Sequence, residues 1–379
     1  MSELHFEKEK KGGKKRLVII IILLIIIAAV VTALILNTDD NSGSITVSDA
    51  KTKAIDLALE PGTVYSHAVT NSKTFFFSPD NVKIASNTGN LEQDMLLKAS
   101  DPIISTDGKY ALIADKGGKT AHLFNGSKLE KSLTLEENII ISKVNSNGYS
   151  IFITEGDVHR HSAIVVNSSG EEIFKWKSGS MYVVSADISD NNKDIAISTV
   201  NTDNGVMTSN VYMFNVTKDK PFTNEPIPDE VLSAMQFDGS FMYCIGVAKT
   251  YIYNDYGKCI ANIDYEDREI LNYVISGGTV ALLFSDSSKT AGGSLVRSYG
   301  AKGDFRGEFY VDSRARFMDL KDNSIAVDNN RVISILDSKC NEKFQLNTET
   351  ALSDFLFLGS SSIAVGITAT GAEIIEVKR

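Results

Sequence analysis

The sequence predicts an all-β fold, a single β-propeller with eight blades favoured, preceded by an N-terminal transmembrane α-helix. Residues 139–176 contain four consecutive strand-like segments separated by polar turns. This unit recurs about eight times at a spacing of roughly 36 to 47 residues, the period of four-stranded propeller blades. An apolar run without charges, residues 17–36, precedes the repeats. Together these observations give the fold class.

The stretch 139–176 is the template for the repeat. Its apolar segments are residues 139–141, 149–153 and 163–166, and the mixed segment 171–176 is typical of a half-buried outer strand. We name the strands a to d from the centre of the ring outward. Each blade is therefore expected to begin at the centre and to end at the rim.

Two independent turn signals keep this phase along the chain. A polar turn precedes the second strand at Asn71, Asp107, Asn147, Asp190, Asp238, Ser276, Asp322 and Gly359. A second turn follows the third strand at Asn125, Asn167, Asn215, Asn254 and Asp337. Either turn alone is common, so it is their shared phase that indicates repeats.

The N-terminal region predicts a single-pass membrane protein. Residues 1–16 form a basic tail of net charge +3, and residues 17–36 are long enough to span a bilayer. The positive charge before the run places the tail in the cytoplasm, and a cleaved signal peptide is the alternative, although its apolar region would be shorter. Residues 37–48 are expected to be a flexible linker, and residues 49–379 an extracytoplasmic propeller.

The two ends of the propeller are expected to meet in one blade. The last unit, from Asp354, contains only three strands, whereas residues 52–59 supply one spare strand with Ile55, Leu57 and Leu59 on one face. This strand would complete the last blade and close the ring. A ring of seven blades is the alternative if residues 64–97 form no unit of their own.

The charge of the chain restricts its partners. The formal net charge is −10, so the chain after residue 16 sums to −13. Nucleic acid is not an expected partner, because affinity for phosphates depends on Lys and Arg displacing counterions. The three cysteines are expected to be buried or half-buried thiols, since Cys244 and Cys259 fall on strands b and d of one unit, too far apart for a disulfide.

The phase and the Asn-x-x-Gly turns resemble those of PQQ-like and WD40-like β-propellers. The basic tail, the apolar run and the acidic repeats resemble an uncharacterised family of membrane-anchored bacterial propeller proteins. The resemblance covers nearly the whole chain, and its motifs are structural. Trp176 is the one tryptophan of the chain, so the Trp-rich outer-strand motif of quinoprotein propellers is absent and no cofactor is expected.

A functional site is expected on the top face, which the b-to-c and d-to-a connections share. The b-to-c loops 155–161, 200–208 and 285–293 and the d-to-a connection 220–231 are long. Loops on a rigid scaffold commonly carry binding residues. Because the closing strand starts at the opposite, bottom face, the membrane anchor would enter from below and the top face would point away from the membrane.

Candidate ligand-binding residues follow from these loops and from two arginines at the start of an innermost strand. Arg314 and Arg316 could hold an anion at the central channel, or they could pair with Asp312 or Asp319. Solvated loop histidines are expected at positions 159 and 161 rather than a metal pair. The candidates are His159, His161, Asp203, Asn204, Lys289, Arg314 and Arg316.

No catalytic constellation and no metal site is identified. Asp187, Asp190 and Asp194 lie close in sequence but lack the spacing of a calcium loop, so a solvated turn is expected. The favoured function is a non-enzymatic module that binds a protein or a cell-envelope component. An enzyme with a channel-mouth site, for which His161, Asp267 and Asp354 are candidates, and a sensor acting through a membrane partner are the alternatives.

Overall fold

The computed structural model describes residues 46–57, 65–203, 205–286 and 292–378, which belong to one unit, Thr46–Arg379. The basic tail 1–16 and the transmembrane helix 17–36 predicted from the sequence lie outside the described residues. Within the described part of the chain, no helix combines the length and hydropathy that crossing a membrane requires.

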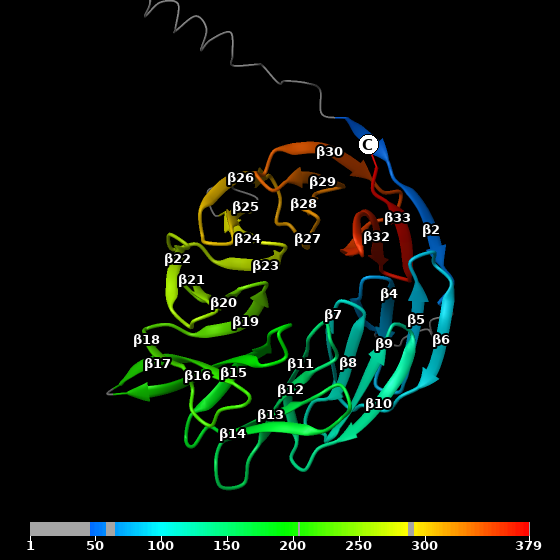
Figure 1. Ribbon diagram of the computed structural model, residues 1–379. Coiled ribbons are helices and arrows are strands. Elements are labelled where there is room, and N and C mark those ends of the chain that lie inside the picture. Colours follow the sequence, from blue (N-terminus) through cyan, green and yellow to red (C-terminus); the bar gives the residue numbers. More distant parts are fainter. Residues whose placement is uncertain (1–45, 58–64, 204, 287–291, 379) are drawn as a thin grey trace, which may run out of the picture. The chain divides into compact units, whose positions relative to one another are not determined.

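The described residues form eight sheets that succeed one another around a centre, which confirms the eight-bladed propeller (Figure 1). Blade 1 contains β3 (Ser66–Val69), β4 (Lys73–Phe77), β5 (Asn81–Ser86) and β6 (Leu91–Leu96), and blade 2 contains β7 (Pro102–Asp107), β8 (Tyr110–Asp115), β9 (Thr120–Asn125) and β10 (Lys128–Thr134). Blade 3 contains β11 (Ile139–Val144), β12 (Ser150–Glu155), β13 (His161–Val166) and β14 (Glu172–Lys177), and blade 4 contains β15 (Tyr182–Ile188), β16 (Asp194–Asp203), β17 (Val206–Asn215) and β18 (Thr223–Pro228).

The second half of the ring continues in the same order. Blade 5 contains β19 (Leu232–Asp238), β20 (Phe241–Gly246), β21 (Lys249–Asn254) and β22 (Cys259–Asp264), and blade 6 contains β23 (Ile270–Ser276), β24 (Thr279–Asp286), β25 (Gly293–Gly300) and β26 (Phe305–Val311). Blade 7 contains β27 (Met318–Lys321), β28 (Ser324–Asn329), β29 (Val332–Asp337) and β30 (Glu342–Asn347), and blade 8 contains β31 (Leu352–Leu358), β32 (Ser360–Thr368) and β33 (Ala372–Glu376).

The N-terminal strand β2 (Lys51–Ile55) closes the ring as predicted. It pairs antiparallel with β33 over its whole length, so that it is the fourth strand of blade 8. Ile55 and Leu57 are buried, 5% and 2% exposed, in a cluster with Leu358 and Val365 of blade 8. The third residue of the predicted apolar face, Leu59, lies outside the described residues.

An additional strand, β1 (Val47–Asp49), was not predicted from the sequence. It pairs parallel with β30, which makes blade 7 five-stranded. Backbone hydrogen bonds from Gln345 N to Thr46 O (3.0 Å) and from Ala50 N to Asn347 O (2.8 Å) continue this pairing at both ends. The last residues assigned to the linker 37–48 therefore belong to the propeller, and the N-terminal segment joins blade 7 to blade 8.

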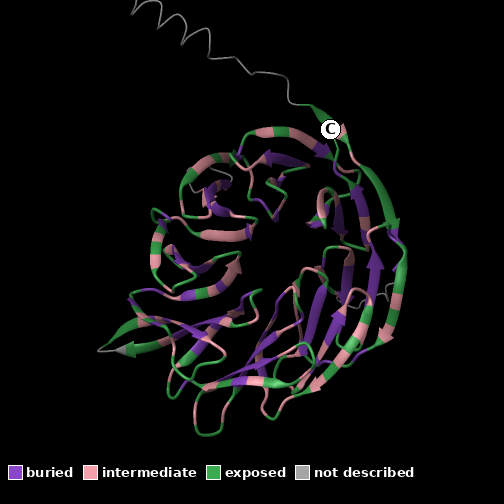
Figure 2. Cartoon of the chain, in the orientation of Figure 1, coloured by how far each residue is buried: buried purple, intermediate pink, exposed green. Residues whose placement is uncertain are grey.

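The core lies within and between the blades (Figure 2). The second strands are nearly completely buried; in β12, for example, only Glu155 is exposed. Outer strands such as β10 alternate between exposed and half-buried residues, as a strand with one solvated face should. The three cysteines are free thiols, Cys244 and Cys340 buried and Cys259 half-buried, as expected.

Backbone and carboxylate contacts lock neighbouring blades at the bottom face. Asp190 Oδ1 accepts the Ser146 N–H of the preceding blade at 2.9 Å. Asp187, in β15, accepts the Phe237 N–H of blade 5 at 2.7 Å. The prediction of one solvated turn for this acidic group is therefore wrong for Asp187, which is partly buried in a strand and holds the next blade.

Two of the loops predicted on the top face are strands. Residues 220–231 contain β18, and residues 200–203 and 206–208 belong to β16 and β17, in which Asp203 pairs with Val206. Pro226 and Pro228 obscured β18 in the sequence. Asp229 N donates to Met207 O at 2.9 Å, which fixes the side of β18 that faces β17. Because successive residues of a strand point their N–H groups to opposite sides, the nitrogens of Pro226 and Pro228 point away from β17. β18 is the outermost strand, so no hydrogen bond is lost there.

Candidate functional site

The structure places the candidate residues from the sequence at separate points of the top face. His159 belongs to the β12–β13 connection of blade 3 and His161 is the first residue of β13, whereas Arg314 and Arg316 belong to the β26–β27 connection between blades 6 and 7. Asp203 ends β16, whereas Asn204 and Lys289 lie outside the described residues. The sequence candidates therefore do not form one site.

The two histidines each have a local structural partner. His159 Nε2 lies 2.6 Å from Ser162 Oγ, and His161 Nδ1 accepts the Val183 N–H at 2.9 Å. Both rings are half-buried, so the expectation of solvated loop histidines is wrong. Burial lowers the pKa of His161, which keeps the ring neutral with its proton on Nε2. Among the described residues, no group of three His, Cys, Asp or Glu side chains could hold a metal ion.

A polar pocket of about 470 Å³ lies beside His161 on the top face of blades 2 to 4. Four carboxylates and two cations line it, so its charge is negative. Arg160 is fixed over the ring of Tyr182, with Cζ 4.7 Å from the ring centroid. The lining residues are Lys119, Glu136, Glu137, Asn138, Glu155, Gly156, Asp157, Arg160, His161 and Tyr182.

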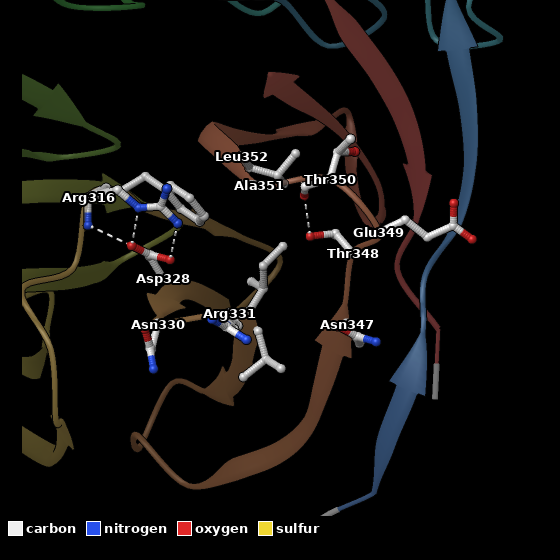
Figure 3. A pocket seen from close by; sticks show the side chains of 13 residues that line it. Arg316, Asp328, Asn330, Arg331, Asn347, Thr348, Glu349, Thr350, Ala351 and Leu352 are labelled. Atoms are coloured by element: carbon white, nitrogen blue, oxygen red, sulfur yellow. Dashed lines mark hydrogen bonds and ion pairs between the residues drawn. The ribbon is translucent and has the colours of Figure 1, made fainter. Parts of the chain in front are cut away.

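A second top-face pocket, which we call the arginine pocket, has a volume of about 350 Å³ and lies at blades 7 and 8 (Figure 3). Its lining includes Arg316 but not Arg314. Neither arginine lies in an innermost strand, because β27 begins only at Met318. Arg316 pairs with Asp328 of β28 rather than with the carboxylates predicted from the sequence. The reason is that the short strand β27 leaves Arg316 beside the upper end of β28.

Exposed apolar side chains lie at the top of three successive blades, in connections and at the adjoining strand ends. We call them the apolar arc: Val158 (98% exposed) in blade 3, Tyr182 (47%), Val206 (40%) and Met207 (51%) in blade 4, and Val247 (64%) in blade 5. The other large apolar residues exposed in the described part lie on β1, on outer strands or at c-to-d turns. Sequence analysis missed the apolar arc, because periodicity does not show which loop residues are exposed.

A buried carboxylate holds one end of the apolar arc. Glu230, 4% exposed, lies between blades 4 and 5, and its Oε1 accepts the N–H groups of Val247 (2.7 Å) and Ala248 (3.2 Å). Gly246 leaves room for this carboxylate, since a Cβ there would lie 2.6 Å from Glu230 Cδ. Glu230 therefore fixes the β20–β21 turn that presents Val247.

Replacing Glu230 by alanine should loosen this turn. We expect Glu230→Ala to lower the free energy of unfolding by about 1 to 2 kcal/mol, because the backbone N–H groups of Val231, Val247 and Ala248 lose their acceptor while water reaches the exposed turn. Glu230→Gln retains one acceptor oxygen and should have a smaller effect. Urea unfolding followed by circular dichroism measures both variants. An unchanged midpoint for Glu230→Ala would show that the carboxylate does not hold the turn.

The alternative enzymatic candidates are also dispersed. Asp267 lies between blades 5 and 6, whereas Asp354 is in β31 of blade 8 and His161 is in blade 3. Asp354 instead contacts His67 of blade 1, with 2.7 Å between Oδ2 and Nε2. This pair joins the first and last blades across the closure, so Asp354 has a structural role.

Comparison with known proteins supports the fold. The C-terminal WD40 domain of Sif2 aligns with a TM-score of 0.57 and 12% identity, covering 88% of this chain and 100% of that chain. Apo AztD from Citrobacter koseri aligns with a TM-score of 0.51 and 12% identity, covering 76% and 86%. A eukaryotic initiation factor aligns with a TM-score of 0.54 and 9% identity, covering 82% and 83%. At these identities the likeness concerns the fold alone.

Sequence comparison gives the family. No curated protein matches the chain. Residues 60–377, which include nearly the whole propeller, match a family described as a family of unknown function. The chain is thus an eight-bladed propeller with WD40-like structural neighbours, and it belongs to the family of unknown function DUF5711.

Proposed function

We propose that the protein is a non-enzymatic binding module that presents the top face of its propeller to a protein partner. The apolar arc carries this proposal. Scattered apolar residues are normal on protein surfaces, whereas a concentration of them on one face is typical of an interaction site. The dispersal of the candidate catalytic residues over different blades favours binding over catalysis.

The charged surroundings of the apolar arc fit a protein partner. The polar pocket beside Tyr182 contributes four carboxylates, and Arg160 lies against the ring of the same tyrosine. Apolar anchors next to a polar, solvated surface are the usual composition of a protein interface. We therefore expect the partner to carry basic residues around an apolar patch, since charge complementarity guides association.

Attachment to a membrane is the second part of the proposal. The twenty uncharged residues 17–36, with the basic cluster before them, support a single-pass anchor whose N-terminus is cytoplasmic and whose propeller is outside the cell membrane. The chain would then act as a tethered receptor for a protein or cell-envelope component. Anchoring keeps the propeller at one surface, where even a modest affinity suffices for capture.

A crosslinking experiment on intact cells tests both parts. A membrane-impermeant crosslinker should join the full-length protein to a specific partner. The double substitution Val158→Asp and Val247→Asp should reduce that product at least about tenfold, because two side chains that the partner would cover become charged. Leu96→Asp is the matched control, since Leu96 is 86% exposed on the outer strand β6.

The outcomes are distinguishable. Persistence of the product in the double variant would remove the apolar arc as the binding site. No product with the impermeant reagent, but a product with a permeant one, would overturn the extracytoplasmic location and leave the binding role standing. Equal thermal unfolding of the three proteins is required for either conclusion.

A further inference from the structure

The arginine pocket has an architecture of its own, separate from the apolar arc. Figure 3 shows Arg316 and Asp328 on one side of the pocket and the segment from Thr348 to Leu352 facing them, with Arg331 between. Phe317, Ile333 and Leu352 are at most 3% exposed and lie beneath the lining, whereas Val332 is half-buried and Ala351 is exposed. The pocket thus combines apolar walls with guanidinium groups.

Arg316 is a fixed and neutralised part of this wall. Its Nε donates to Asp328 Oδ2 at 2.7 Å and its Nη2 to Asp328 Oδ1 at 2.8 Å, while the Arg316 backbone N–H also donates to Oδ2 at 3.0 Å. The guanidinium Cζ lies 5.8 Å from the centroid of the Phe317 ring. Asp328 is only 3% exposed, so this bidentate pair is rigid and has no net charge.

Arg331 supplies the charge that is not balanced. It occupies the two-residue turn between β28 and β29, where Asn330 adopts a φ of 66° and Arg331 N donates to Asn329 O at 2.9 Å. Its side chain makes no ion pair among the described residues. The other acidic residue of the lining, Glu349, extends away from the pocket in Figure 3. A single guanidinium on a fixed turn is therefore available to a ligand.

We propose that the arginine pocket binds a carboxylate that carries an apolar substituent about the size of a leucine side chain. The planar guanidinium of Arg331 matches a carboxylate in bidentate fashion, and the substituent would contact Val332 and Ala351. A volume of about 350 Å³ is near the lower end of small-molecule sites, which suits a group the size of one amino-acid residue.

A carboxylate fits better than a phosphate for two reasons. One unbalanced guanidinium neutralises a single negative charge, whereas phosphate monoesters carry nearly two at neutral pH. The chain after residue 16 has a net charge of −13, which disfavours strongly anionic ligands at long range. This proposal does not depend on the apolar arc, because the two sites belong to different blades.

Titration calorimetry on the full-length protein in detergent tests the ligand class. The probes are N-acetyl-leucine and N-acetyl-leucinamide, which differ in the carboxylate alone. We expect the acid to bind at least about tenfold more tightly than the amide, because a charge-assisted bidentate hydrogen bond is lost with the amide. Equal affinities, or no binding of the acid, would overturn the proposal.

Arg331→Gln and Arg314→Gln form a matched pair of variants. Both remove an exposed arginine of the top connections, but only Arg331 lines the pocket. Arg331→Gln should weaken binding of the acid at least about fivefold and remove the preference over the amide, while Arg314→Gln should leave both unchanged. Equal effects of the two substitutions would mean that each arginine attracts the acid only through the electrostatic field of the whole protein, which would contradict the proposal.

Peptide probes identify the source of the carboxylate. A hexapeptide ending in leucine is compared with its C-terminal amide and with N-acetyl-leucine. Tighter binding of the free-acid peptide than of N-acetyl-leucine would assign the pocket to a protein C-terminus. Equal binding of the two acids would assign it to a free small-molecule acid. Both results support recognition of a carboxylate, whereas binding of the peptide amide as tightly as the peptide acid would contradict it.

Discussion

A chain that lacks residues 46–57 is expected to be aggregated rather than folded. The deletion removes β1 and β2 and leaves β30 and β33 as exposed edges. It also removes the buried side chains of Ile55 and Leu57, whose burial contributes about 1.5 to 3 kcal/mol each. That sum is comparable with the net stability of a domain, about 5 to 15 kcal/mol. Unpaired apolar edges favour association between chains.

Two point variants separate the closure from general effects of a deletion. Ile55 is buried at the end of β2, whereas its neighbour Ala54 is exposed. Ile55→Asp should destabilise the propeller by several kcal/mol, because it buries a charge without a partner. Ala54→Asp should change the stability by less than about 1 kcal/mol. Size-exclusion chromatography and thermal melts measure both, and a soluble, cooperatively melting deletion variant would disprove the closure.

The ring could be predicted from the sequence because its turn chemistry is local. Asn167 Oδ1 accepts the N–H groups of Ser169 and Glu171, and Asn254 Oδ1 accepts those of Tyr256 and Lys258 at the equivalent turn. A short polar side chain that satisfies the backbone two and four residues later leaves a repeated mark in the sequence. The same pattern recurs at Asp337, whose Oδ1 accepts the N–H groups of Lys339 and Asn341, and this recurrence fixes the phase.

Two strands, β1 and β18, could not be predicted from the sequence, and each has a physical reason. β1 has only three residues, and its pairing with β30 joins positions about 300 residues apart, so no local pattern records it. β18 contains two prolines, which local rules assign to a loop. Both are outer strands, where one unpaired edge relaxes the sequence requirements. Edge strands are therefore the least predictable part of this fold.

The candidate sites could be predicted less well than the fold, because they depend even more on contacts between residues that are distant in the sequence. The loops were recognised as top-face connections, but the partner of Arg316 is set by where β27 begins, and the exposure of Val158 and Val247 is set by the neighbouring blades. Arg331 was overlooked because one arginine in a two-residue turn has no sequence signal. Only the folded ring shows that it is unpaired among the described side chains.

Three buried carboxylates are expected to lower the stability of the propeller between about pH 5 and about pH 7.5: Asp107, whose pKa burial raises to about 7, Asp187 and Asp319. Burial raises the pKa of Asp187 to about 6 and that of Asp319 to about 6. Both side chains accept a backbone N–H of the next blade, from Phe237 and from Phe357, at 2.7 Å. The two carboxylates thus accept hydrogen bonds between blades at positions where burial makes their negative charge unfavourable.

The sign follows from proton linkage. Between the unfolded value near 4 and the folded value near 6, the folded protein binds more protons at these two groups, so its stability falls as the pH rises. From about pH 5 to about pH 7.5 the loss is on the order of 1 kcal/mol per group, or about 2 to 3 kcal/mol together. Burial lowers the pKa of His122 and of His161, and these two groups oppose the trend.

The double variant Asp187→Asn and Asp319→Asn tests these two carboxylates, because the histidine contribution cancels in the comparison with the parent protein. An amide oxygen can still accept the N–H of Phe237 and of Phe357, so the blades remain joined while the charge is removed. The stability of the variant relative to the parent should increase by about 2 to 3 kcal/mol from about pH 5 to about pH 7.5. Because the residues are in blades 4 and 7, their effects should add. Urea unfolding at both pH values measures this, and parallel pH profiles for the variant and the parent would show that Asp187 and Asp319 do not titrate as inferred.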